Sequence, residues 1–447
     1  MFDKFTKFLD EKLSRPMAAL SQQKHLRAVR DGIIATLPII IVASMFLVIG
    51  FLPNSLPESW GFTQFIADNQ FKILLPYRMS MYIMTLYAVF GIGFSLAKSY
   101  ELDGLSGGIL AELAYLLTVV PVMVPAAGEG VMELASGNAE LASYLDSLPG
   151  GFVIPMANLG SGGMFIGIIS AFIAVEIYRF TQNSGFRITM PEQVPPSIAR
   201  SFEALTPTII VLILFASVTM WMEVDVHGIV NNLVQPLISA SDSLLSVLLI
   251  TFLNSFFWFF GIHGASIVGS VARPLWLVLL EQNSSAYAIG EAVPNMAPEP
   301  FYQWFMYIGG SGATIGLALA LFLTKSKYTR TLSKTAIVPA VFNINEPLIF
   351  GTPIVLNPIL LIPFLITPMI TAIIAWFAIQ WELVNRIVAL APWTLPGPIG
   401  AFLATGNDWR AAVLNILLIL VATAIYYPFV MMYDKQLLEE EKAAEEN

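Results

Sequence analysis

Residues 33–52 read IIATLPIIIVASMFLVIGFL and contain no charged side chain. A helix needs roughly 20 apolar residues to cross the hydrocarbon core of a bilayer, and this stretch is that long. The whole chain has the same character, since 56% of its 447 residues are hydrophobic and only 12% are charged, whereas a soluble domain carries about a quarter charged residues. One globular core cannot bury so much apolar surface, and the remainder must face lipid. We therefore predict an all-α polytopic membrane protein.

Apolar runs long enough to span a membrane recur along the chain. They lie at about 31–52, 79–97, 105–125, 161–180, 205–222, 240–260, 265–281, 303–324, 354–380 and 411–433. Basic residues flank several runs, with Lys24, Arg27 and Arg30 before the first and Lys325 and Lys327 after the eighth. Because Lys and Arg are enriched on the cytoplasmic side, both termini are predicted in the cytoplasm. That orientation needs an even number of crossings, and about ten satisfies it.

The sequence divides into four parts. We predict an amphipathic cytoplasmic segment at 1–30, a transmembrane half of conventional spans at 31–222 and an acidic cytoplasmic tail at 434–447. In the half at 223–433, prolines and glycines interrupt the apolar runs. Irregular backbone at membrane depth is tolerated only where protein or a water-filled cavity satisfies its polar groups, and transporters use broken helices to build a midplane site. A ligand site is therefore expected in the later half.

A histidine stands inside one of these interrupted runs. His263 lies in FWFFGIHGAS (257–266), directly before Gly264. An ionisable residue within a membrane run is costly, so it predicts a functional site. The alternative is a neutral histidine that bonds a backbone carbonyl at a kink. Asn254 lies just over two helical turns earlier and is assigned to the same cavity as His263 and Gly264.

A carboxylate stands in a second interrupted run. Glu346 lies in VFNINEPLIFGTP (341–353), among apolar neighbours that make an unpaired charge costly. Asn343 and Asn345 supply amide donors and acceptors beside it, a combination that suits the hydroxyls of a neutral sugar. Because Pro347 blocks helix continuation, we expect a loop or a hairpin tip. The alternative is a structural ion pair with a nearby arginine.

Three further side chains have weaker signals. Trp393 in ALAPWTLPGPIGAF (389–402) presents an aromatic face suited to a sugar ring, but tryptophan also belongs at membrane interfaces. Arg78 and Arg273 pair with acids or reach a phosphate, and the structural role is the favoured one for both. The sequence alone leaves these alternatives open.

Several chemistries are absent from the sequence. The chain has no cysteine, which excludes disulfides, thiolate metal sites and a cysteine phosphorylation site of its own. No P-loop, dinucleotide fingerprint, G-x-S-x-G or His/Glu metal spacing occurs. With three histidines in all, we expect neither a metal site nor a cofactor. The sequence contains no basic patch with interleaved aromatic residues, the pattern that would indicate binding to a nucleic acid.

Three segments together resemble one family. They are MPEQVPPSIARSFEALTP (190–207), FGIHG (260–264) and NINEPLIFGTPIVLNP (343–358). They are similar to the IIC permease subunit of the bacterial phosphotransferase system, in its lactose, cellobiose and N,N'-diacetylchitobiose branch. The NINEP-to-LNP stretch is the most specific part of the resemblance, which covers essentially the full length.

The resemblance implies a mechanism. Such subunits are homodimers of the bacterial cell membrane with ten spans, in which the first five make most of the dimer contact. The last five spans, with two re-entrant hairpins, hold a disaccharide. His263 and Glu346 would contact the sugar near the hydroxyl to be phosphorylated, and Trp393 would line the same pocket. The phosphoryl group would come from a phosphocysteine on a separate IIB protein, which IIA and HPr supply in turn.

Two other functions fit parts of the pattern. A proton-coupled secondary sugar transporter would use a buried histidine and carboxylate equally well. A membrane enzyme acting on lipid-linked sugar would show acidic clusters at the membrane surface, and the sequence has none of that kind. The phosphotransferase permease is the function that we predict, for a β-linked disaccharide of glucose or N-acetylglucosamine.

Overall fold

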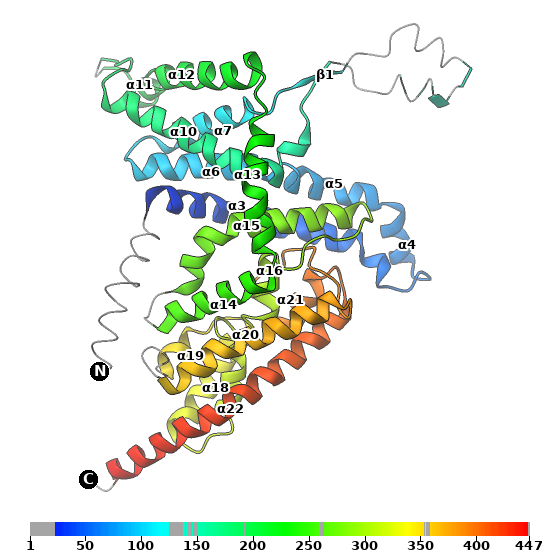
Figure 1. Ribbon diagram of the computed structural model, residues 1–447, viewed down its shortest axis with the longest axis vertical. Helices are drawn as coiled ribbons and strands as arrows, with labels where there is room; N and C mark the ends of the chain where they lie inside the picture. The colour runs from blue at the N-terminus through cyan, green and yellow to red at the C-terminus, as the bar shows by residue number, and fades with distance from the viewer. Residues whose placement is uncertain are drawn as a thin grey trace. The chain divides into compact units, whose positions relative to one another are not determined.

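The computed structural model describes most of the chain. The described residues are 23–124, 137–138, 140–141, 143, 145, 151–191, 193–259, 263–352, 354 and 358–445. Most of the predicted amphipathic segment at 1–30 lies outside these residues, and so do Gly261, Pro353 and the end of the acidic tail. The described chain is almost entirely helical (Figure 1), with one short antiparallel pair of strands, β1 (Val122–Val124) and β2 (Gly151–Val153).

The chain forms two compact units. One contains Tyr82–Leu233, and the other joins Met1–Met81 to Val234–Asn447. The first predicted span therefore shares a unit with the later part of the chain, and it packs against residues 70–81 as well as residues 264–288. The predicted boundary between residues 222 and 223 separates a half for dimer contact from a half for sugar binding. That division of function stays a prediction.

The unit Tyr82–Leu233 is a helical bundle. Its main helices are α6 (Met84–Ser99), α7 (Gly104–Leu116), α10 (Met164–Asn183), α11 (Pro196–Glu203) and α12 (Leu205–Ala216), followed by a π-helical turn at Ser217–Trp221. α6 and α7 approach closely, because a Cβ placed on Gly93 would lie 2.4 Å from the Cβ of Ala111. Small residues at a helix contact are typical of packing within a membrane.

The other unit holds every residue singled out as a candidate site. Its helices are α3 (Lys24–Gly50), α4 (Gly61–Asp68), α5 (Gln70–Met81), α14 (Leu244–Phe259), α15 (Gly264–Ala288), α16 (Glu299–Phe305), α17 (Ile315–Leu321), α18 (Lys327–Val341), α19 (Glu346–Gly351), α20 (Pro358–Gln380), α21 (Gly397–Ala404) and α22 (Trp409–Glu445). α13 (Val226–Ser241) precedes α14 and belongs partly to each unit.

The all-α polytopic class is confirmed. Among the described residues, seven helices are long and apolar enough to cross a membrane, or eight when a bent pair counts as one span. That pair is α13 and α14, which meet at 75°. At the bend, Asp242 accepts hydrogen bonds from the backbone N–H of Met296 (2.9 Å) and Ala297 (2.7 Å). The total of ten crossings stays a prediction.

The apolar run at 303–324 does not form one continuous helix. α16 ends at Phe305 and α17 begins only at Ile315, and we call residues 307–314, which lie between them, the glycine turn. Four of its residues have positive φ, a left-handed conformation that stops a right-handed helix: Gly309, Gly310, Gly312 and Ala313. The Tyr426 hydroxyl on α22 donates to the Gly312 carbonyl at 2.8 Å, so the turn is bonded inside the protein.

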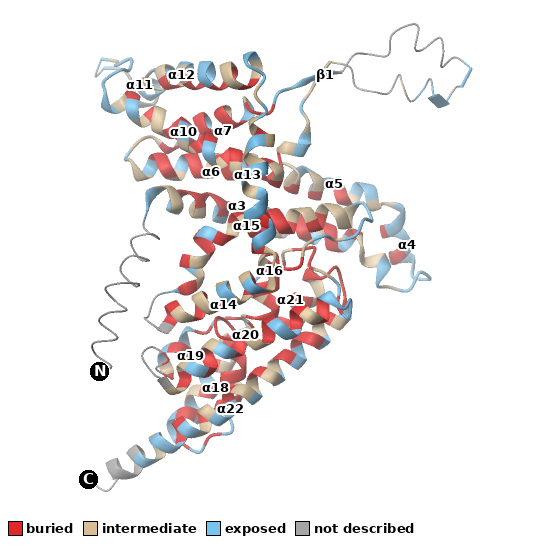
Figure 2. Cartoon of the chain, in the orientation of Figure 1, coloured by how far each residue is buried: buried red, intermediate tan, exposed pale blue. Residues whose placement is uncertain are grey.

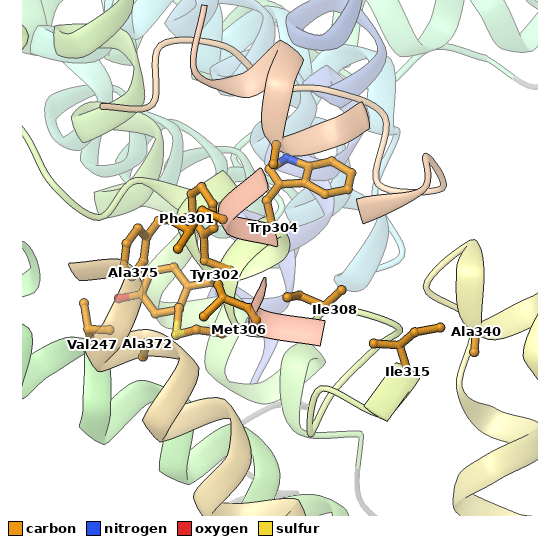
Figure 3. Close-up of a cluster of buried hydrophobic side chains, with 14 of the residues drawn as sticks. Val247, Phe301, Tyr302, Trp304, Met306, Ile308, Ile315, Ala340, Ala372 and Ala375 are labelled. Carbon is orange, nitrogen blue, oxygen red and sulfur yellow. The ribbon is translucent and has the colours of Figure 1, made fainter. Parts of the chain in front are cut away.

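Aromatic side chains of α16 form the centre of this unit's core. Phe301, Tyr302, Trp304 and Phe305 are all buried. Figure 3 shows Phe301, Tyr302 and Met306 gathered beside Val247 and the α20 alanines. The indole of Trp304 lies against Gly400 of α21, where a Cβ would come within 2.2 Å of the ring. The helix that ends at this interruption is thus buried in the core of the unit.

The last helix has one packed face and one free face. α22 packs along α17 and α20, and its residues alternate between buried and exposed along its length (Figure 2). Ile416, Leu417 and Leu420 are exposed on it. Exposed aliphatic residues on a helix of spanning length indicate a lipid-facing surface.

The first predicted span is bonded to the segment before α22. The Ser44 hydroxyl of α3 accepts from the Leu390 N–H at 3.1 Å, and the Asn407 side chain donates to the Val48 carbonyl at 3.1 Å. These contacts explain why α3 belongs to the unit that contains residues 234–447.

The glycine turn is expected to be intolerant of a methyl group. At Gly312 (φ +85°), a Cβ would lie 2.3 Å from the ring of Phe364, whereas at Gly290 (φ +76°) it would meet nothing within 4 Å. Gly290→Ala should cost about 1 kcal/mol for left-handed backbone, and Gly312→Ala about 1–3 kcal/mol more for overpacking. Thermal denaturation of the two variants in the same detergent checks this, and equal melting temperatures would contradict it.

Candidate functional site

The candidate residues lie in two groups. Asn254, His263 and Gly264 surround the junction of α14 and α15. The second group lies between α18 and α19, where Asn343 and Asn345 precede Glu346. His263 and Glu346 each stand at the start of a helix that follows an interruption of the chain, whereas Asn254 lies within α14.

His263 is the N-cap of α15. Its Nδ1 accepts a hydrogen bond from the Ser266 N–H at 3.3 Å, and the Ser266 hydroxyl lies 3.1 Å from the same nitrogen. A nitrogen that accepts an N–H carries no proton, so the neutral ring carries its proton on Nε2. The ring of Trp258 lies beside it, with centroids 4.7 Å apart. The exposed histidine therefore retains one N–H donor for a ligand.

Gly264 allows α15 to begin directly against α14. A Cβ at this position would lie 1.9 Å from the Asn254 carbonyl oxygen and 2.6 Å from its side-chain oxygen. Asn254 itself is buried, with 1% of its surface exposed, and within the described part of the chain neither amide atom has a partner in hydrogen-bond geometry. The Tyr307 side chain lies next to it. An orphaned buried amide is costly, which marks Asn254 as a position where a ligand polar group would be favourable.

Glu346 is the first residue of α19. Leu348 and Ile349 pack into the core, while Glu346 and Phe350 are exposed. The expectation that apolar neighbours enclose the carboxylate was therefore wrong, because Pro347 starts a short helix with only one buried face.

The alternative of a structural ion pair is not what the structure shows. Arg273 of α15 pairs with Glu299 of α16 at 2.7 Å. Among the described residues, Glu346 has no basic side chain within ion-pair distance. The carboxylate is thus available to a ligand, and Arg273 has the structural role that the sequence favoured.

Asn343 joins three segments. Its Nδ2 donates to the carbonyls of Trp393 (2.7 Å) and Leu395 (3.0 Å), and its Oδ1 accepts from the Gly309 N–H (2.8 Å). Its backbone has φ +62°. The residue therefore holds the start of the Glu346 loop to the glycine turn and to the Trp393 segment.

Asn345 makes a parallel contact. Its Nδ2 donates to the Ser311 carbonyl at 2.8 Å, and a Cβ on Gly310 would lie 2.3 Å from its amide carbon. The amides that the sequence assigned to a sugar are thus largely used by backbone groups. Their direct contact with a sugar stays a prediction that no contact here tests.

Within the described residues, Trp393 is bonded to the rest of the unit through its backbone carbonyl, not through its side chain. Its carbonyl accepts from Asn343, while 53% of the residue's surface is exposed. The indole is free to present a face to a ligand, the use that an aromatic ring has against a sugar.

The glycine turn is the element that sequence reasoning missed. It connects the two groups, since Tyr307 lies next to Asn254 and the Gly310 N–H donates to the Tyr307 carbonyl at 2.8 Å. Its far side receives Asn343 and Asn345. The signal was the GGSG run at 309–312, which the apolar residues on either side concealed within a predicted span.

Metal chemistry has no support within the described residues. There, no three His, Asp or Glu side chains gather in a way that could hold an ion. The arrangement instead offers a carboxylate, a histidine N–H and aromatic faces, which suit a polar, uncharged ligand with many hydroxyls.

Comparison with known proteins agrees with this chemistry. The family model described as "Phosphotransferase system, EIIC" matches residues 30–368. A putative permease IIC component, YwbA, of Bacillus subtilis is 37% identical over 99% of this chain and 98% of its own length. A cellobiose-specific EIIC component of Geobacillus stearothermophilus is 37% identical over 99% of this chain and 97% of its own.

A solved structure has the same fold. It is the transporter ChbC, the IIC component of an N,N'-diacetylchitobiose-specific phosphotransferase system. It is 35% identical, with a TM-score of 0.86 over 97% of this chain and 99% of that one. The family match, the full-length relatives and the apolar helices lead to one conclusion: the chain belongs to the EIIC family of the phosphotransferase system and is the multi-pass sugar permease subunit of such a system.

Proposed function

We propose that the permease carries a β-linked disaccharide of the cellobiose or N,N'-diacetylchitobiose type and presents one sugar hydroxyl to a phosphocysteine on a separate IIB protein. The observation that carries the proposal is the exposed, unpaired carboxylate of Glu346 on a loop bonded by two asparagines. The names of the cellobiose-specific relative and of ChbC support the substrate class.

The absence of cysteine supports a separate IIB protein. The sequence has no thiol that could carry the phosphoryl group as a phosphocysteine. Lactose-specific relatives named EIICB, such as the one from Staphylococcus haemolyticus, match 96% of this chain but extend beyond it, because only 70% of their length is matched. We propose that IIA and HPr supply IIB in turn, that the permease is a homodimer, and that both termini face the cytoplasm.

Glu346 is assigned the role of general base or orienting group. The sugar hydroxyl oxygen attacks phosphorus, the S–P bond of the phosphocysteine breaks, and the thiolate of IIB leaves. The hydroxyl proton passes to the Glu346 carboxylate. Positioning and charge placement dominate phosphoryl transfer, so a carboxylate at a defined position is what the protein must supply.

The other residues bind the sugar. The Nε2–H of His263 donates to a hydroxyl near the one that reacts, which excludes the wrong orientation. The face of Trp393 stacks on a ring, and the orphaned amide of Asn254 pairs with a hydroxyl beside Gly264. The assignments to His263 and Trp393 use groups that the protein's own contacts leave available, and Asn254 shares its surroundings with Tyr307.

Replacement of Glu346 by glutamine should separate binding from chemistry. Glu346→Gln keeps the shape and the hydrogen-bonding capacity but cannot accept the proton. We expect the Kd for sugar to change by less than about threefold, and the phosphorylation rate at saturating phospho-IIB to fall roughly 100-fold or more. The matched control is Glu291→Gln, another exposed glutamate in the same unit, which should phosphorylate at the normal rate. A normal phosphorylation rate in Glu346→Gln would contradict the role of Glu346 as general base.

Replacement of His263 by asparagine should remove the imidazole Nε2–H but keep the helix cap, because the shorter amide does not reach the position of Nε2. Asparagine is a good N-cap and can still accept from the Ser266 N–H. We expect the Kd for disaccharide to rise about 10-fold through loss of one hydrogen bond, with a melting temperature close to that of the unmodified protein. Isothermal titration in detergent measures this. An unchanged Kd would show that His263 only ties the helix end.

The transported product distinguishes this function from proton-coupled transport. Vesicles that contain the permease and enclose purified phospho-IIB should accumulate sugar phosphate from external cellobiose or N,N'-diacetylchitobiose, more readily than from lactose. An uncoupler should not prevent accumulation. If free sugar accumulates instead, and the uncoupler abolishes it, the chain is a symporter.

A further inference from the structure

We propose that Asn343 is a positioning residue, which sets the distance and orientation between Glu346 and Trp393 rather than binding sugar itself. The inference rests on the proposed function and assigns a distinct task within it. Its basis is the set of three hydrogen bonds by which one side chain connects the Glu346 loop, the glycine turn and the Trp393 segment.

The amide of Asn343 has little capacity left for a ligand. An asparagine side chain offers two N–H donors and two acceptor lone pairs. Both donors are used, on the carbonyls of Trp393 and Leu395, and one lone pair accepts from Gly309. With 8% of its surface exposed, the residue is placed to hold protein segments, not to read hydroxyls.

The carbonyls that Asn343 bonds need a donor. Pro392, Pro396 and Pro398 flank Trp393 and Leu395 in an irregular segment, and proline has no N–H to offer. A carbonyl without a partner inside a membrane protein costs the free energy of a lost hydrogen bond. The Asn343 amide fills that need from the neighbouring loop, so the Trp393 segment is fixed relative to the loop that carries Glu346.

The backbone of Asn343 serves the same geometry. Its φ of +62° turns the chain out of α18, and the next residue, Ile344, donates its N–H to the Pro339 carbonyl at 2.9 Å. Asparagine tolerates this left-handed conformation better than other side chains except glycine. Glycine at 343 therefore keeps the backbone and removes only the side-chain bonds, which makes it the informative substitution.

A matched control exists in the same unit. Asn407 is also an asparagine with positive φ (+70°), is buried, and donates its Nδ2 to a backbone carbonyl, that of Val48. Its partners are α3 and Ser55 rather than the glycine turn or the Trp393 segment. Asn407→Gly thus makes the same chemical change where no site residue depends on it.

The first experiment compares Asn343→Gly with Asn407→Gly in the full-length permease. Both should lower the melting temperature, and Asn343→Gly should lower it more, because it removes three side-chain hydrogen bonds and Asn407→Gly removes one. Only Asn343→Gly should raise the Kd for the disaccharide about 10-fold, because misplaced site residues lose about one hydrogen bond to the sugar. The same variant should lower the phosphorylation rate at saturating sugar by a comparable factor. A purely structural role would reduce stability in both and leave both Kd values normal.

The second experiment measures coupling. If Asn343 acts by placing Trp393, then Asn343→Gly should raise the Kd by less than about twofold in a Trp393→Ala background. Asn343→Asp isolates the two donors, since aspartate still accepts from Gly309 but offers no N–H to Trp393 or Leu395, and it should bind sugar as weakly as Asn343→Gly.

The outcomes separate the two claims. Absence of disaccharide binding by the unmodified protein would overturn the proposed function and this role together. Normal binding and phosphorylation by folded Asn343→Gly, or a full 10-fold effect that persists without Trp393, would overturn the positioning role alone.

Discussion

Backbone polar groups that lie in a membrane must find their hydrogen-bond partners inside the protein, and the region from α16 to α21 is organised by that requirement. The chain there is broken by Gly309, Gly310 and a run of prolines, so regular helix bonds are missing. Side-chain amides take their place, as Asn343 does for Trp393 and as Asn415 does for the Trp304 carbonyl at 2.6 Å. The irregular segments are therefore bonded to other parts of the same unit.

The hydrogen bonds within these segments decide which polar groups remain for a ligand. Asn343 and Asn345 are largely occupied by the protein, whereas Glu346, the Nε2–H of His263 and the ring of Trp393 are not. A catalytic carboxylate must be held at a defined position during phosphoryl transfer. In the proposed mechanism, the asparagines beside Glu346 hold the loop that carries this carboxylate.

The sequence predicted the helical membrane class and the interrupted later helices, because both follow from local composition. Long apolar runs require lipid, and costly residues such as His263 and Glu346 stand out within them. Local pattern failed where a non-local contact decided the structure. The run 303–324 has the hydropathy of a span, yet the glycine turn interrupts it. The turn has residues with positive φ, and it is stabilised by hydrogen bonds from Asn343 and Tyr426, which lie far away in the sequence.

The same distinction applies to the individual residues. The sequence by itself determined a helical membrane protein whose later apolar runs are interrupted around His263, Glu346 and Trp393, because hydrophobicity and proline act over a few residues. Only the tertiary structure decided that Nδ1 of His263 caps α15, that Glu346 is unpaired, and that Asn343 bonds to Trp393 fifty residues away. Hydrogen-bond partners that lie this far apart in the sequence depend on how the helices pack, and a local sequence pattern does not predict that packing.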